Sequence, residues 1–153
     1  MITNHCTDPY ARHAATGWNV LATAASDGTV TYSVNDEDIG AGQANFRISS
    51  SCSELGIGSV ILVIFEGSDR YSQPFRDQLE PVAFGSIRGS IHYAAGRITK
   101  QLPDYRFWIV NYVGAVRLLS VANYAQTEWT QVERLFETGI LTAPSFAGDT
   151  LRP

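Results

Sequence analysis

The stretch Ser59–Phe65, SVILVIF, is an almost unbroken run of apolar residues, most of them aliphatic. A short run rich in Val and Ile predicts a strand rather than a helix, because β-branched side chains favour extended backbone. A strand that is apolar on both faces is typical of the centre of a sheet covered on each side, and we expect helices to form both covers. The predicted fold is therefore built around this strand.

Other elements are predicted ahead of this central strand. A β-hairpin is expected from Trp18–Ala25 and Thr29–Val34, because the intervening Ser26-Asp27-Gly28 supplies the local hydrogen bonding and the positive φ of a tight turn. A helix is expected over residues 35–48, since Asn35 can cap it and three carboxylates follow in its first turn. The chain before the central strand thus predicts a hairpin and then a helix.

The chain after the central strand predicts an alternation of helices and strands. Pro74 fits the first turn of a short helix, and the apolar residues of the last third of the chain fall at helical spacing. The expected elements are a helix at Ser72–Leu79, strands at Val82–Arg88 and Arg106–Val113 joined by a long loop, helices at Ala115–Tyr124 and Thr127–Glu137, and a short strand at Ile140-Leu141.

Length and composition predict one soluble globular domain. The chain has 153 residues, of which 44% are hydrophobic and 17% are charged. The longest apolar run, Val60–Phe65, is far shorter than the roughly 20 residues that span a bilayer, and the N-terminus MITNHCTDPY lacks the pattern of a secretory signal. Cys6 and Cys52 lack the spacing of a zinc site, and we expect both to be reduced thiols.

The charges are distributed unevenly. The net charge is −4, which disfavours a dedicated nucleic-acid binder. Residues 81–127 nevertheless hold five basic side chains against one acidic one, a local excess of +4. Such a segment can dock on an acidic partner, or it can be a solvated face whose charges are balanced in space by the acidic remainder. The basic side chains are Arg88, Arg97, Lys100, Arg106 and Arg117.

Motifs of catalysis or cofactor binding are sparse. The three histidines, His5, His13 and His92, are far apart and lie in no metal-site or nucleophile-elbow pattern. Gly56-x-Gly58 lacks the third glycine of a dinucleotide fingerprint. We therefore expect a protein that is not an enzyme and that uses no metal and no cofactor.

Three stretches resemble the actin-depolymerising-factor homology domain, the cofilin-like family, and its coactosin branch most closely. They are Ser33–Glu37 (SVNDE), Phe75–Arg88 (FRDQLEPVAFGSIR) and Arg106–Phe136 (RFWIVNYVGAVRLLSVANYAQTEWTQVERLF). The resemblance covers about residues 33–142 and implies that residues 1–32 are an N-terminal hairpin extension and residues 143–153 a C-terminal tail.

The resemblance implies an α/β (α+β) fold, with a central mixed β-sheet of about five strands flanked by helices. It also implies non-enzymatic binding to actin, filaments rather than monomers, by a monomeric protein of the cytoplasm and cytoskeleton that needs no cofactor. The family's long helix and its preceding turn enter a cleft of actin, and a basic residue before the aromatic strand contacts the filament. The implied actin-binding residues are Arg88, Arg97, Lys100, Arg106, Val113, Arg117, Leu118, Ser120, Val121 and Tyr124.

Two other hypotheses remain open. The same fold can bind a different protein or an anionic lipid head group through its basic residues. Alternatively, the chain is a small α/β enzyme whose site is assembled from residues far apart in the sequence, which predicts a pocket with convergent polar groups.

Overall fold

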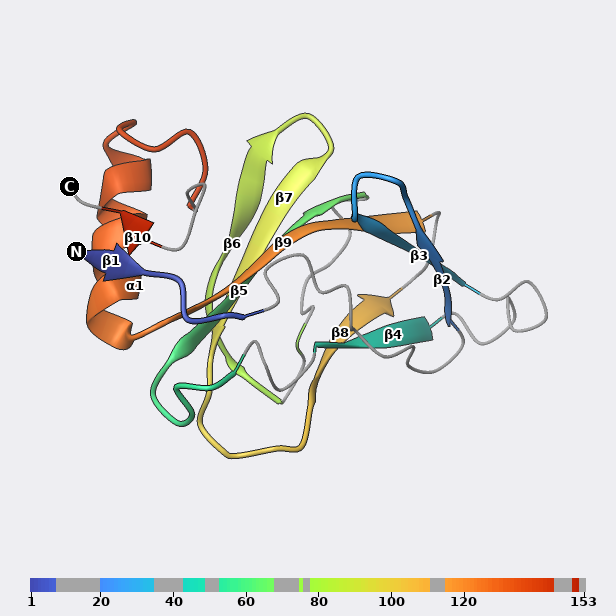
Figure 1. Cartoon of the computed structure of the whole chain (residues 1–153), viewed down its shortest axis with the longest axis horizontal. Coiled ribbons are helices and arrows are strands. Elements are labelled where there is room, and N and C mark those ends of the chain that lie inside the picture. Colours follow the sequence, from blue (N-terminus) through green and yellow to red (C-terminus); the bar gives the residue numbers. More distant parts are fainter. Residues whose placement is uncertain are drawn as a thin grey trace.

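The computed structural model describes residues 1–7, 20–34, 43–48, 53–67, 75, 78–110, 115–144 and 150–151. Strands predominate in them, and six form an antiparallel sheet in the order β2-β3-β9-β5-β7-β6, with β4-β8 and β1-β10 as separate two-stranded sheets (Figure 1). The elements are β1 (Ile2–Thr3), β2 (Val20–Ala24), β3 (Val30–Val34), β4 (Gln43–Ile48), β5 (Val60–Glu66), β6 (Glu80–Arg88), β7 (Ile91–Arg97), β8 (Tyr105–Val110), β9 (Ala115–Tyr124), α1 (Gln126–Glu137) and β10 (Thr150–Leu151).

The predicted α/β fold with a mixed, helix-flanked sheet is wrong. All strand pairs between described residues are antiparallel, and α1 is the one helix in that part of the chain. The expected helix at Ala115–Tyr124 is strand β9, which pairs with β3 on one side and β5 on the other. No helix in the described ranges is long and apolar enough to cross a membrane.

A β-bulge explains why the apolar residues of β9 fall at helical spacing. Ile64 pairs with Ser120 and the next residue, Phe65, pairs with Leu118, so Leu119 is an extra residue in β9. Ahead of the bulge alternate residues are buried, beyond it Val121–Tyr124 are buried on both faces, and Leu118 and Leu119 together break the period of two. The resulting pattern imitates that of a helix.

Other predicted elements also differ. Within the expected helix at residues 35–48, Gln43–Ile48 is strand β4, and the rest lies outside the described residues. The expected long loop between two strands contains strand β7. Ile140-Leu141 is no strand, because both backbone amides donate to the Leu135 carbonyl in the turn that ends α1. The expected helix at residues 72–79 and the turn at residues 112–114 lie mostly or wholly outside the described residues.

The predicted hairpin is confirmed as β2 and β3. Gly28 in its turn has a φ of 88°, and Asp27 Oδ1 accepts hydrogen bonds from the backbone amide of Thr29 (3.0 Å) and its hydroxyl (2.6 Å). The hairpin is not an appendage, however, because β3 continues the large sheet by pairing with β9.

The central strand is β5, and both of its faces are covered, as predicted. Ile61, Val63 and Phe65 belong to a core shared with β4 and β8, whereas alternate residues from Val60 to Ile64 belong to a core shared with α1 and β1. One cover is thus a second sheet instead of a helix. In the first core, the ring centroid of Phe107 is 4.9 Å from that of Phe46 and 5.0 Å from that of Phe65.

The N-terminal segment is fastened across the end of the sheet. The Asn4 side chain accepts a hydrogen bond from the Asn123 amide (3.0 Å), and Glu128 accepts one from the Thr3 amide (3.1 Å). Cys6 is buried and takes part in a disulfide bond, so the expected reduced thiol is wrong at this position. The sequence has one other cysteine, Cys52, which lies outside the described residues.

Candidate functional site

The residues implied for actin binding separate into core residues and surface residues. Leu118, Val121 and Tyr124 are at most 1% exposed and belong to the two cores, so they stabilise the fold and are not available to a partner. Val113 lies outside the described residues. The six that reach the surface are Arg88, Arg97, Lys100, Arg106, Arg117 and Ser120.

Arg97 joins three elements within the fold. Its Nη1 donates to Glu80 Oε2 and its Nε donates to Gln126 Oε1, both at 2.8 Å. These bonds connect the end of β7 to the start of β6 and the start of α1. The guanidinium of Arg97 is therefore occupied by structural contacts.

Arg117 lies between two carboxylates. Its Nη2 is 3.9 Å from Asp27 Oδ2 and its Nη1 is 3.7 Å from Glu66 Oε2. Hydrogen bonds from Thr29 lower the pKa of Asp27, and the nearby Arg117 charge lowers it further, so Asp27 is ionised at neutral pH. The local charge around Arg117 is thus −1, which does not suit an acidic partner.

Arg106 has a different environment on the outer face of the small sheet. It lies directly opposite Arg47 in the β4–β8 pair, and their neighbours Phe46 and Phe107 point to the core on the other face. Like charges placed opposite one another on adjacent strands destabilise a sheet. Arg47 was missed from the sequence because it falls within the helix expected over residues 35–48. The alternation of Phe46 and Ile48 with Arg47 was the signal that could have revealed it.

Asp104 only partly neutralises this arginine pair. Its Oδ2 lies 3.6 Å from Arg47 Nε and its Oδ1 lies 3.8 Å from Arg106 Nε, which are ion-pair distances but too long for hydrogen bonds. Neither guanidinium donates a hydrogen bond to any described residue, and Arg106 Nε is buried without an acceptor. The cluster of Arg47, Arg106 and Asp104 therefore has a net charge of +1 and unused donors.

Asn45 lies beside this cluster and shares its face of the sheet. It is two residues from Arg47 on β4, so the two side chains project to the same side. Asn45 is only 1% exposed, and within the part of the chain that the structure describes neither of its amide atoms has a hydrogen-bond partner. A buried polar group left in this way costs about 1–3 kcal/mol. Because Asn45 is buried, a partner does not reach it, and we call Arg47, Asp104 and Arg106 the arginine face.

The loop before β8 holds Lys100 near the start of that strand. The Tyr105 hydroxyl donates to the Lys100 carbonyl (3.0 Å) and accepts from the Leu102 amide (3.3 Å), which fixes the loop from within. Lys100 itself is exposed and forms no ion pair with a described residue. It is the nearest basic residue in sequence to the arginine face on the β8 side.

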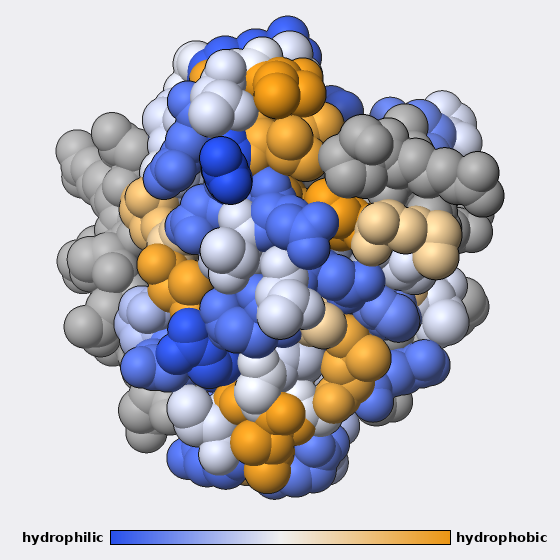
Figure 2. Space-filling view, turned by 90° about the vertical axis from the view of Figure 1, so that its left-hand side faces the viewer, coloured by the Kyte–Doolittle hydropathy of each residue, from blue (hydrophilic) through white to orange (hydrophobic). Residues whose placement is uncertain are grey.

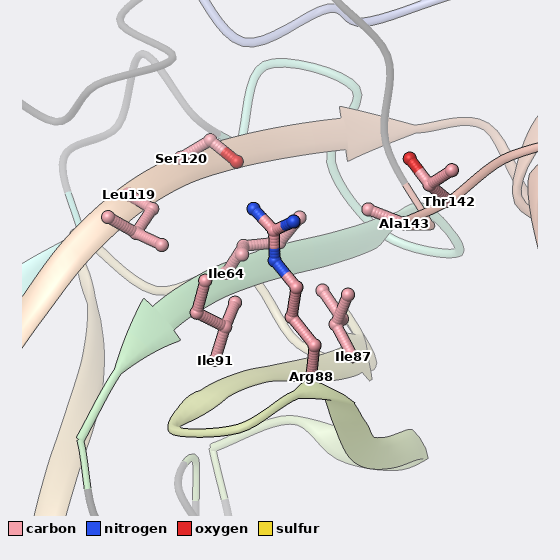
Figure 3. A pocket seen from close by; sticks show the side chains of 8 residues that line it. All are labelled: Ile64, Ile87, Arg88, Ile91, Leu119, Ser120, Thr142 and Ala143. Carbon is pink, nitrogen blue, oxygen red and sulfur yellow. The ribbon is translucent and has the colours of Figure 1, made fainter.

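Arg88 and Ser120 line the same pocket, which lies on the face of the large sheet away from the β4–β8 sheet. Figure 3 shows the Arg88 side chain extending from the end of β6 across β5 toward Ser120 on β9. The pocket has a volume of about 300 Å³. It is lined by Ile64, Ile87, Arg88, Ile91, Leu119, Ser120, Thr142 and Ala143.

Other groups of side chains give weaker evidence of a functional site. Among the described residues, no three His, Cys, Asp or Glu side chains come close enough together to hold a metal ion. Figure 2 shows the side of the molecule that carries α1, where hydrophobic residues form separate patches between hydrophilic ones, as far as the described residues show.

No protein-family model, curated protein or solved structure matches this chain.

Proposed function

We propose that this chain is a non-enzymatic binding module for an acidic partner protein, which it contacts through the arginine face. One observation carries the proposal: Arg47 and Arg106 lie opposite each other and share a single carboxylate without hydrogen-bonding to it. A guanidinium binds a carboxylate best through two parallel hydrogen bonds, and those donors are unused here. Glu and Asp side chains of a partner would supply hydrogen-bond acceptors to both guanidinium groups.

The exposure of the two arginines supports this proposal. Their side chains are 44% and 39% exposed, so a partner can reach them from solvent. The local positive charge on a protein of net charge −4 would orient an acidic partner toward this face. Arg97 and Arg117 add little, because carboxylates of the same chain already neutralise them.

Actin is the acidic partner that the resemblance implies, and it stays a prediction. Fewer residues support actin than the sequence suggests, because residues 115–124 form a strand in the sheet and not the helix that would enter the cleft of actin. What supports it is Arg106, the basic residue before the aromatic strand. If actin is the partner, the contact is the arginine face, and a cytoplasmic, cytoskeletal location goes with it.

The test is co-sedimentation with actin filaments over a salt series. We expect the wild type to pellet at low salt and to be released as ionic strength rises through about 0.1–0.15 M, where the screening length is about 8–10 Å. Arg106→Glu should weaken pelleting by about tenfold or more, since it reverses a central contact charge. Arg134→Glu makes the same charge change on the exposed side of α1 and should leave pelleting unchanged.

The outcomes separate the partner from the surface. Equal pelleting of the wild type and Arg106→Glu would overturn the arginine face as the contact. No pelleting of the wild type would exclude actin, and the same variants are then mixed with phosphatidylserine vesicles. Vesicle binding that Arg106→Glu abolishes would assign the face to anionic lipid and contradict an acidic protein as its ligand.

A further inference from the structure

The pocket at Arg88 combines an aliphatic floor with a single charge. Ile64 of β5, Ile91 of β7 and Leu119 of β9 line it from three strands, and Ile87 adds a fourth aliphatic side chain (Figure 3). Ile64 and Ser120 are paired across β5 and β9, so their side chains emerge on the same face. The β-bulge at Leu119 places a leucine beside that serine instead of alternating it to the other side.

Arg88 is the charged group of this pocket. It forms no hydrogen bond or ion pair with a described residue, unlike Arg97 on β7 and Arg117 on β9. Its guanidinium reaches over isoleucine side chains toward the middle of the pocket (Figure 3). Because Arg88 is exposed, water partly screens its charge, and the attraction for an anion is reinforced by apolar contact with the floor of the pocket.

Two hydroxyl groups complete the polar part. Ser120 lies on β9, and Thr142 lies in the segment that follows α1. Both appear on the side of the pocket toward which Arg88 extends (Figure 3). The polar atoms of the lining are thus an arginine and two hydroxyls, a set that can donate hydrogen bonds to an anionic head group.

We propose that this pocket binds a small amphiphile with an anionic head, a medium-chain carboxylate. The carboxylate pairs with Arg88 and accepts from Ser120 or Thr142, and the alkyl chain covers the aliphatic floor. The volume of about 300 Å³ is at the lower end of ligand pockets and suits a medium chain rather than a long one. This site is independent of the proposed function, because the arginine face lies beyond the other core.

The test uses octanoate as the probe, below its micelle concentration, with 1-octanol as a neutral ligand of the same chain length. We expect octanoate to bind the wild-type protein in a calorimetric titration and to shift the NMR signals of Ile64, Ile91 and Leu119. Arg88→Gln should weaken octanoate binding by about tenfold or more and leave the weaker binding of 1-octanol unchanged. Arg134→Gln, an exposed arginine on α1, is the matched control and should bind octanoate like the wild type.

Three results would overturn the inference. Absence of octanoate binding to the wild type excludes the ligand class. Equal octanoate affinities of the wild type and Arg88→Gln exclude the arginine as the head-group anchor. Signal changes confined to the apolar patch at Leu135 and Ile140, outside this pocket, place any binding elsewhere.

Discussion

Tyr124 shows how burial of one residue couples stability to pH. It lies at the end of β9 with 1% of its surface exposed, and its ring centroid is 6.5 Å from that of Trp129. Burial raises the pKa of the Tyr124 phenol, and the nearby carboxylate of Glu128 raises it further. In the folded protein this phenol therefore keeps its proton at a pH where an unfolded tyrosine loses it.

We expect the wild-type protein to lose stability in alkali more steeply than Tyr124→Phe. Above about pH 10 the unfolded state binds fewer protons than the folded state, so the free energy of unfolding decreases with pH. The stabilisation is fully present below that pH. The phenyl ring of the variant cannot ionise, so its urea unfolding between pH 8 and pH 11 should show a shallower decline.

Tyr93→Phe is the matched control for this measurement. Burial also raises the pKa of Tyr93, followed by the charges of Glu133 and Glu137, but Tyr93 is only partly buried and water screens its surroundings. We expect a smaller change of slope than for Tyr124→Phe. Identical slopes for the wild type and Tyr124→Phe would contradict the shifted pKa.

At the scale of an element, β7 depends on close approach at Gly96. A Cβ at this position would lie 2.7 Å from Leu79 Cβ and 3.1 Å from Phe75 Cδ2, and both of these side chains are buried. Real Cβ atoms do not approach others so closely, so an added methyl group forces the core apart. The glycine lets Phe75 and Leu79 pack directly on the strand.

Gly96→Ala should therefore lower the free energy of unfolding by about 1–3 kcal/mol in urea denaturation. Gly85→Ala on the neighbouring strand β6 is the comparison. Its Cβ would meet the outer end of the Tyr93 ring at 2.9 Å, and that ring is partly exposed and can move. We expect a smaller loss for Gly85→Ala, and the reverse order would contradict this packing of Gly96.

Elements with strong local signals could be predicted from the sequence. The apolar run of β5 is too short for a typical helix, so a strand is the structure that it predicts. Asp27-Gly28 defines the β2–β3 turn through hydrogen bonds between residues close in sequence. Helix α1 was expected to begin at Thr127 and in fact has Ala125 as its N-cap. Alanine has no side-chain acceptor, so the capping hydrogen bond is made by Glu128, whose carboxylate accepts from the Ala125 backbone amide (3.0 Å).

Elements that depend on distant partners could not be predicted. The bulge that gives β9 the apolar pattern of a helix exists only because β5 pairs with this strand. Strand β7 contains Ala94, Ala95 and Gly96, which have little intrinsic preference for strands. The site follows the same rule. Arg106 was singled out by its position before aromatic residues, but Arg47 becomes its neighbour only when β4 and β8 align.

At the scale of the whole molecule, the disulfide bond of Cys6 fastens the N-terminal segment to the body of the protein. We expect Cys6→Ala to lower the free energy of unfolding by about 2–5 kcal/mol. A reducing agent should produce a similar loss in the wild type and none in the variant. Rapid alkylation of Cys6 in the folded, untreated protein would contradict the bond.

The same disulfide bears on where the protein works. Disulfide bonds persist in oxidising compartments and are rare in the cytosol. The cytoplasmic location and the actin partner stay predictions, and this bond weighs against both. The redox state of Cys6 in protein taken directly from cells decides the matter, since a reduced thiol there would remove the objection.

The pairing of β1 with β10 determines how the molecule responds to force. Ile2 lies opposite Leu151 at the end of the pair nearest both chain ends, and the two strands lie together beside α1 (Figure 1). Tethers attached ahead of Ile2 and behind Leu151 would peel this pair open one residue pair at a time, the geometry with the least mechanical resistance. On the N-terminal side, the load would then pass through the Asn4 contacts to the covalent bond at Cys6. The N-terminal segment would therefore yield under small loads up to Cys6, and the covalent bond would hold beyond it.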